Sequence, residues 1–434
     1  MRRPLIVSLA LILGSTGAVQ AQEKTYTFSP SEYQRKTFEM GGYAEGRIEI
    51  FDLNPDSAFY ELNKPSGDRP GVDERATGTL ELTGKYHKDI TTLNFTLHGD
   101  GDRDVVFGNN FEAKLYEGGL GLQPKTGLSF YLGKKTLLWG KGYAWNPTGF
   151  VQHPKDPTDP NLAREGYTIV SADYTRSLAS APIKTIGLTS VILPTTPAIN
   201  NDFGREHHLD IAAKLYMLIG NTDVDMMALS GGAKSARYGA DFSSAVTPAL
   251  ELHGELAYIS ASTRIVLNGA GQPVPITGSA TSYLMGMNYL TELSTTYILE
   301  YYHNGGGFKN SEAIAFYQLA HEASAQYNTT GNTSLLQKAD MISNMYMRPN
   351  PMRNYLNFKV SQKEPFNILY FTPSLTIQVN LTDHSYLILP ELLYTGYKNI
   401  ELRLRGQANI GPQLTEFGEK QASSRAELRV RYYF

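Results

Sequence analysis

The sequence predicts an all-β fold, a transmembrane antiparallel up-and-down β-barrel of about 18 strands, within a range of roughly 16 to 20. Three observations lead to this prediction. Short segments alternate apolar with polar residues, and the connectors between them are alternately short and long. After the N-terminus, no apolar run reaches the roughly 18 residues that a membrane-spanning helix needs. A strand turns successive side chains to opposite faces, so one face can meet lipid and the other water.

The N-terminus has the pattern of a secretory signal peptide over residues 1–21. Arg2 and Arg3 precede an apolar stretch over 5–13, and Val19-Gln20-Ala21 is a small-residue cleavage site. We expect a polar periplasmic segment over 22–36 and one barrel domain over 37–434. Cleavage would leave 37 of the 39 basic residues against 42 acidic ones, a net charge of about −5, which is unlike a nucleic-acid-binding protein. The absence of cysteine excludes disulfides and Cys-ligated metals.

Eighteen segments have the alternation and the length of a tilted membrane strand. In the last one, Leu428 and Val430 share one face, while Arg429 and Arg431 share the other. The segments cover residues 42–52, 80–86, 93–98, 111–115, 128–132, 168–175, 183–193, 209–219, 224–229, 237–242, 250–256, 283–290, 295–302, 355–361, 368–381, 386–394, 400–405 and 424–434.

The connectors are the strongest evidence for a barrel, because periplasmic turns are short and outer loops are long. A soluble sandwich or propeller gives no reason for every second connector to be long. An even strand number also places both termini on the periplasmic side. The short set covers 87–89, 123–126, 178–182, 220–221, 245–248, 291–293, 363–365 and 396–397, and the long set covers 54–75, 100–109, 139–165, 194–206, 263–280, 305–351 and 408–423, with two short outer members near Gly231 and Asp383.

The longest connector, 305–351, predicts a helical insertion with helices over 311–327 and 334–346. Ser334 and Gln337 have the spacing of a capping box, and Leu335, Ala339 and Ile342 belong to a helical stripe. Two interpretations remain open: a helical hairpin that partly closes the outer mouth, or a loop that packs on itself.

The connector over 139–165, here called the constriction loop, is the third outer loop. It contains both tryptophans of the chain and four prolines. Its candidate functional residues are Trp139, Lys141, Trp145, Asp156, Asp159 and Arg164.

Two regions resemble a broad group of porin-like Gram-negative outer-membrane barrels, which includes alginate-export-type and related families. One region contains Leu138-Trp139-Gly140-Lys141-Gly142, Asn146-Pro147, Lys155-Asp156-Pro157, Asp159-Pro160 and Arg164-Glu165-Gly166; the other contains Pro390-Glu391-Leu392 and the terminal Arg429 to Phe434. The resemblance covers roughly a fifth of the chain. It implies an outer-membrane location, a third loop folded into the lumen, and a terminal aromatic residue that the barrel assembly machinery reads. It also implies outer-membrane lipid and lipopolysaccharide as partners.

Strand parity predicts which charged side chains line the lumen. The inward-facing side chains of the last two strands and the first form an arc with more arginines than glutamates. Glutamates on strands roughly across the lumen make that side acidic. Opposed charges across the lumen produce a transverse electric field, which favours polar solutes. The alternative is that these charges pair along the wall and only keep the lumen wet. The predicted lining residues are Glu45, Arg47, Glu49, Lys85, Glu251, Glu255, Glu300, Arg403, Arg405, Arg425, Arg429 and Arg431.

These observations favour a channel for small hydrophilic solutes, anionic ones among them. A substrate-specific transporter or polysaccharide exporter gated by its loops is the alternative. Catalysis, cofactors and metal ions are not expected, because the candidate clusters are poor. His207 and His208 are adjacent and would point to opposite faces of a strand. The turn Asp100-Gly-Asp102-Arg-Asp104 resembles a calcium loop, but Val105 stands where such a loop needs glycine.

Overall fold

The computed structural model describes residues 37–179 and 182–434, and residues 37–434 form one compact unit. The predicted signal peptide, its cleavage site and the polar segment 22–36 lie outside the described residues.

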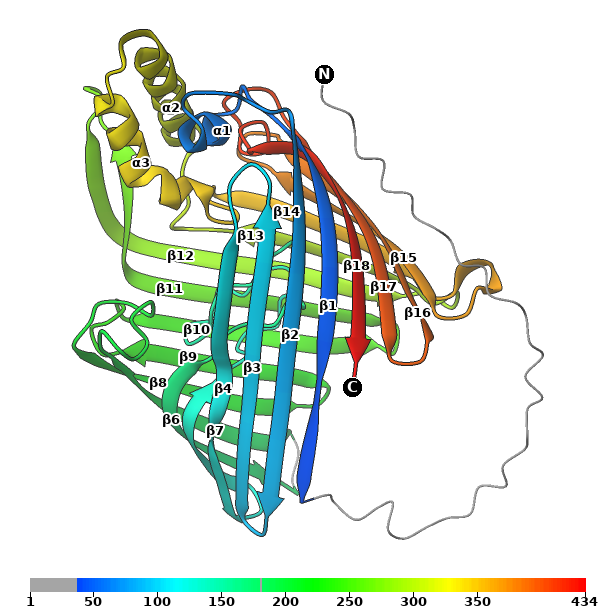
Figure 1. The fold of residues 1–434 in the computed structure, drawn as a ribbon. Coiled ribbons are helices and arrows are strands. Elements are labelled where there is room, and N and C mark those ends of the chain that lie inside the picture. Colours follow the sequence, from blue (N-terminus) through cyan, green and yellow to red (C-terminus); the bar gives the residue numbers. More distant parts are fainter. Residues whose placement is uncertain (1–36, 180–181) are drawn as a thin grey trace, which may run out of the picture. The chain divides into compact units, whose positions relative to one another are not determined.

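The described chain is a closed antiparallel barrel of 18 strands, which confirms the predicted fold class (Figure 1). Each strand pairs with its neighbours in sequence, and β18 pairs with β1 to close the cylinder. Closure leaves no sheet edge whose backbone groups would be unpaired in lipid. The strands are β1 (Phe38–Leu53), β2 (Val72–Lys88), β3 (Thr91–Asp104), β4 (Asn110–Lys125), β5 (Leu128–Lys135), β6 (Tyr167–Ser177), β7 (Ile183–Thr195), β8 (His208–Ile219), β9 (Thr222–Ser230), β10 (Arg237–Thr247), β11 (Leu250–Leu267), β12 (Pro273–Leu290), β13 (Thr295–His303), β14 (Asn354–Gln362), β15 (Phe371–Asn380), β16 (Tyr386–Tyr397), β17 (Ile400–Ile410) and β18 (Ala422–Tyr433).

The register separates an apolar outer face from a polar inner face. At the seam, Ile48 lies opposite Leu428, and both are exposed on the outside. Their neighbours Glu49 and Arg429 are only 2% and 3% exposed, because they point inward against other side chains. The barrel wall is therefore apolar on its outer face and charged on its inner face.

Exposed tyrosines mark the end of the barrel that carries the short connectors. Tyr86, Tyr174 and Tyr432 lie near the ends of β2, β6 and β18, and Tyr289 faces Tyr297 across the β12–β13 turn. Aromatic residues collect at membrane–water interfaces because their rings are apolar and their hydroxyls are polar. This arrangement resembles one of the two aromatic girdles of a membrane barrel.

Two predicted outer loops are too long, since strands extend into them. The predicted outer loop 263–280 is a two-stranded extension of β11 and β12, paired as far as Leu267 and Pro273. The predicted connector 100–109 is shorter, because β3 continues to Asp104 and pairs there with Arg75 of β2. The aspartates of the candidate calcium turn therefore belong to a strand.

Both helices of the long insertion are confirmed, as α2 (Asn310–Thr330) and α3 (Ser334–Met347). The predicted capping box is wrong: Thr333 is the N-cap residue of α3, and the Ser334 amide donates to Asn332 Oδ1 at 2.9 Å. A short helix in the first outer loop, α1 (Ala58–Asn63), was not predicted. No described helix is long and apolar enough to cross a membrane.

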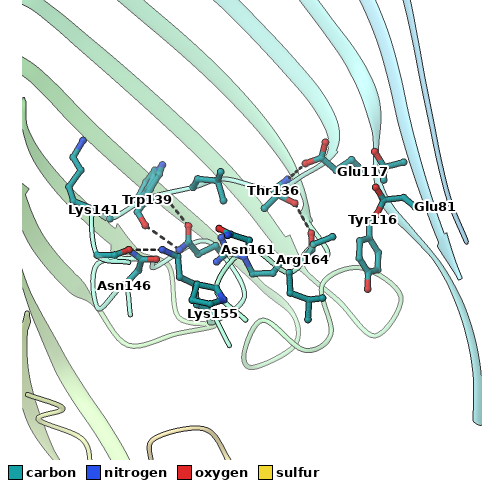
Figure 2. A pocket seen from close by; sticks show the side chains of 18 residues that line it. Glu81, Tyr116, Glu117, Thr136, Trp139, Lys141, Asn146, Lys155, Asn161 and Arg164 are labelled. Carbon is teal, nitrogen blue, oxygen red and sulfur yellow. Dashed lines mark hydrogen bonds between the residues drawn. The ribbon is translucent and has the colours of Figure 1, made fainter. Parts of the chain in front are cut away.

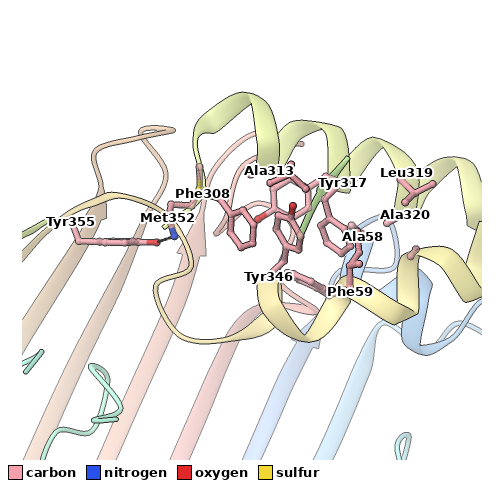
Figure 3. Close-up of a cluster of buried hydrophobic side chains, with 14 of the residues drawn as sticks. Ala58, Phe59, Phe308, Ala313, Tyr317, Leu319, Ala320, Tyr346, Met352 and Tyr355 are labelled. Carbon is pink, nitrogen blue, oxygen red and sulfur yellow. Dashed lines mark hydrogen bonds between the residues drawn. The ribbon is translucent and has the colours of Figure 1, made fainter. Parts of the chain in front are cut away.

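The largest apolar core lies among the outer loops, where three helices meet (Figure 3). Tyr346 of α3 stacks between Phe308 and Phe316 with ring centroids 4.0 and 4.1 Å apart. Phe59 of α1 packs against Phe316, and Trp145 of the constriction loop belongs to the same cluster. The hairpin therefore packs on two other loops as well as on itself.

Candidate functional site

The constriction loop leaves the wall after β5 and crosses to strands far around the barrel, where two glutamates hold its backbone. Glu255 of β11 accepts hydrogen bonds from the amides of Lys141 and Gly142, both at 2.7 Å. Glu300 of β13 accepts from the amides of Tyr143 and Ala144. Hydrogen bonds to an ionised acceptor are about twice as strong as neutral ones, so these contacts fix the loop firmly.

Strand parity predicts Glu255 and Glu300 as pore-lining residues, but neither is accessible to a solute in the lumen. Glu255 is 4% and Glu300 0% exposed, because the constriction loop covers both. Glu300 also contacts His253 Nε2 at 2.9 Å. The third predicted glutamate, Glu251, is partly exposed and binds Ser243 and Asn288 on the wall instead of the loop.

Two glycines allow the loop to approach this wall so closely. Gly140 has φ +94°, and a Cβ there would lie 2.8 Å from a carboxylate oxygen of Glu255. A Cβ on Gly142 would lie 2.1 Å from the carbonyl oxygen of Trp145. The Trp-Gly-Lys-Gly sequence is thus a backbone feature that lets successive amides face a carboxylate.

The far part of the loop is held by arginines. Asp159 lies 3.2 Å from Arg429, 3.4 Å from Arg405 and 3.9 Å from Arg403. Burial alone would raise the pKa of Asp159, but these three guanidinium groups hold it below its ordinary value. The loop therefore bridges two separate regions of the wall, from β11 and β13 to β17 and β18.

The six predicted arginines do come together on neighbouring strands, and we call them the arginine arc. Each has a carboxylate partner: Glu45 is 2.6 Å from Arg431, for example, and Glu391 is 2.6 Å from Arg405. This pairing along the wall is the alternative that the sequence left open. Lys85 lies apart from the arc, on β2 opposite Glu39 and Asn94. The remaining arc contacts join Arg47 and Arg425 to Glu49, Arg403 to Glu401, and Arg429 to Glu427.

The other predicted loop residues have different surroundings. Lys141 forms an ion pair with Asp225 of β9 at 3.0 Å. Trp139 is buried and exchanges backbone hydrogen bonds with the side chain of Gln152. Arg164 donates to the carbonyl of His153 at 3.2 Å, while Asp156 is exposed and only caps Thr158.

Sequence reasoning missed Asp225 and Asp241 as inward-facing residues. They lie opposite each other on β9 and β10 and are 1% and 3% exposed. The alternation of Asp223, Asp225 and Met227 along β9 carried the signal, but the predicted strand began only at Val224.

The loop divides the space around it into cavities. One has a volume of about 550 Å³ and is lined by Trp139, Lys141, Lys155 and Arg164, with Glu81 and Glu117 on the facing wall (Figure 2). A second, of about 410 Å³, shares Lys155, Asn146 and Gln152 with the first. A third, of about 170 Å³, lies between Asp159 and the arginine arc.

The weak metal and acid–base candidates have local partners. His98 contacts Asp100 at 2.9 Å, and Arg75 contacts Asp104 at 2.7 Å. His207 precedes β8 with φ +62°, and His208 begins the strand. Among residues 37–179 and 182–434, no group of three or more His, Asp or Glu side chains could hold a metal ion.

No family model and no curated protein matches the sequence. Solved structures do match. OccK2 (OpdF) of Pseudomonas aeruginosa is 11% identical with a TM-score of 0.53, covering 92% of this chain and 97% of that one. The structure of OccK2 in complex with glucuronate is 10% identical with a TM-score of 0.51, and the match covers 92% of this chain and 98% of that one. OccAB3 of Acinetobacter baumannii is 10% identical with a TM-score of 0.50, and the match covers 92% of this chain and 99% of that one.

Identities this low show the fold alone. The matched structures support a porin-like β-barrel and give no support to the alginate-export type in particular. The chain has the porin-like β-barrel fold.

Proposed function

We propose that this protein is an outer-membrane channel for small hydrophilic solutes, with a preference for anions. The observation that carries the proposal is the constriction loop, which crosses a closed barrel and leaves polar cavities lined by basic side chains. The exposed apolar outer face and the tyrosine girdle support a location in lipid, with lipopolysaccharide and the assembly machinery as the expected partners.

Charge around the cavities supports the anion preference. The largest of the three is lined by Lys141, Lys155 and Arg164 against Glu81 and Glu117. Lys141 is paired with Asp225 and Glu81 contacts His98, which leaves Lys155 and Arg164 against Glu117. The smallest is lined by Lys359, Arg403 and Arg405 against Asp159 and Glu391. Arginine suits a solute pathway because it stays charged and binds carboxylate or phosphate with two donors.

The arginine arc can be tested by charge reversal. We expect the variant R403E/R405E to shift ion selectivity toward cations, since it replaces two positive charges beside Asp159 and Glu391 with negative ones. The measurement is the reversal potential of reconstituted channels under a KCl gradient.

The matched control is Lys398→Glu, an exposed residue in the turn between β16 and β17. It should leave the reversal potential unchanged. Equal reversal potentials for R403E/R405E and the unaltered protein would contradict a solute pathway along the arc.

A substrate-selective channel is the second candidate, favoured by the sizes of the cavities. Volumes of about 550 and 410 Å³ fall within the range of small-molecule sites, roughly 300–1,000 Å³. One matched structure is a complex with glucuronate, which makes this sugar acid a suitable first solute to test. In liposome-swelling assays, a selective channel should pass glucuronate faster than glucose, whereas a general pore should pass both equally.

A further inference from the structure

Four basic side chains converge on the 410 Å³ cavity between the outer loops. Lys155 comes from the constriction loop, Lys234 from the β9–β10 connector, Arg237 from the start of β10, and Arg348 from the residue after α3. The lining contains no aspartate or glutamate. Ser262 and Asn304 add neutral hydrogen-bonding groups.

None of the four makes an ion pair with a carboxylate of the described residues, in contrast to the members of the arginine arc. Arg237 Nε is buried without a hydrogen-bond partner. Lys155 donates only to the carbonyls of Gly142 and Tyr143, and Lys234 to that of Phe150 at 3.4 Å. Lys155, Lys234 and Arg237 are partly buried, and Arg348 is exposed at the edge of the cavity. Partly burying cationic groups without anionic partners is costly, so this cavity favours a negatively charged ligand.

We propose that this cavity is a binding site for a small solute with two or more negative charges, which the protein takes up before the solute passes the constriction loop. The inference rests on the proposed channel function and deepens it. A single carboxylate can be shared by two guanidinium groups, but four cations from four segments surround the space. Lys155 lines this cavity and the 550 Å³ cavity beyond, so it can contact the solute in both.

Lys234 gives the site a second property. Burial and the neighbouring Arg237 lower the pKa of Lys234 to about 7, against the opposing influence of Asp210 and Asp202. Near neutral pH, Lys234 is therefore partly deprotonated when no anion is bound beside it. A bound dianion would raise its pKa again, so binding should take up a proton.

The test compares three six-carbon solutes with increasing charge: glucose, glucuronate and glucarate, which carry zero, one and two carboxylates. Binding to the detergent-purified full chain is measured by isothermal titration calorimetry. We expect glucarate to bind ~10-fold or more tightly than glucuronate, and glucose not to bind. Titrations at pH 7.5 in buffers of different ionisation enthalpy should show proton uptake with glucarate, and this uptake should disappear in K234M.

The variant R237Q/R348Q should lose ~10-fold or more in glucarate affinity, and R237K/R348K should lose less because it keeps the charges. Arg205→Gln, an exposed arginine in a neighbouring outer loop, is the control and should bind normally. Each variant is first checked for the heat-dependent electrophoretic mobility of a folded barrel.

Equal affinity for glucuronate and glucarate, or normal glucarate binding by folded R237Q/R348Q, would overturn the site. Single-channel recordings distinguish this failure from that of the channel itself. Open KCl conductance without any block by glucarate would refute the site alone, whereas absence of conductance would refute the proposed function.

Discussion

Glu255 and Glu300 hold the first part of the constriction loop against the wall. Each carboxylate accepts hydrogen bonds from two successive loop amides, and Glu255 also accepts from Thr148. A loop amide buried without a partner would cost about 1–3 kcal/mol, so these acceptors replace the water that the loop loses.

Replacing both glutamates with glutamine should loosen the constriction loop. The variant E255Q/E300Q keeps the side-chain shape but removes the charge that attracts four loop amides. We expect larger and more frequent current fluctuations in single-channel recordings, with the mean conductance raised. Glu251→Gln is the matched control, because Glu251 lies on the same strand and bonds only to Ser243 and Asn288. Recordings of E255Q/E300Q as quiet as those of the control would show that other contacts position the loop.

Alternation in the sequence predicts which way a side chain points, but not what covers it. Alternation placed Glu255 and Arg403 on the inner face, since period-2 alternation is a local property of a strand, and both side chains contact the constriction loop. Their surroundings depend on a loop whose contacts come from residues about 100 or more positions away. The sequence therefore could not distinguish a wet glutamate from one that holds a loop.

At the scale of elements, a single histidine joins three outer loops. His321 on α2 contacts Glu61 of α1 at 2.8 Å and Glu419 of the last outer loop at 3.1 Å. Hydrogen bonds to Glu419 and Glu61 outweigh the effect of burial and raise the pKa of His321 to about 10. The pKa of Glu419 is lowered because His321 and two backbone amides outweigh its burial.

This contact predicts a pH dependence for the outer loops. The folded-state pKa of His321 lies above the ordinary value of 6.5, so its stabilisation is fully present below about pH 6.5 and is lost as pH rises toward 10. We expect faster hydrogen exchange, corrected for the intrinsic pH effect, at residues 54–71 and 411–421 in H321Q than in the unaltered protein. The difference should be large at pH 6 and should shrink near pH 10.

The control is Glu322→Gln on the same helix, which should exchange like the unaltered protein at every pH. A constant difference between H321Q and the unaltered protein from pH 6 to 10 would exclude the proton on His321 as its cause.

Most strands and helices could be predicted from the sequence, and the elements that were not predicted have local explanations. All eighteen strands and both long helices were found, because each has a clear period of 2 or 3.6. The extension of β11 and β12 to Leu267 and Pro273 was missed, since its glycines, prolines and small polar residues are typical of loops. Helix α1 has only six residues, which is too short to show a period.

At the scale of the whole molecule, the membrane location requires that the exposed apolar face of the barrel contacts lipid. Leu404 of β17 is 50% exposed on that face, while Gln407 on the same strand points inward and lies opposite Arg425. Leu404→Arg should destabilise the barrel by about 2–4 kcal/mol at mid-membrane, whereas Gln407→Arg should have a much smaller effect. The measurement is urea-dependent folding into lipid vesicles, and similar losses for both variants would argue against the assignment of the two faces.

The constriction loop begins between β5 and β6, yet its anchoring carboxylates belong to β11 and β13 and its ion-pair partners to β17 and β18. The wall residues that hold this loop inside the barrel are therefore distributed over several strands around the circumference. In a chimera that carries this loop in another barrel without the matching glutamates and arginines, the loop would not be held against the wall. The conformation of this loop can be transplanted only together with the parts of the wall that hold it.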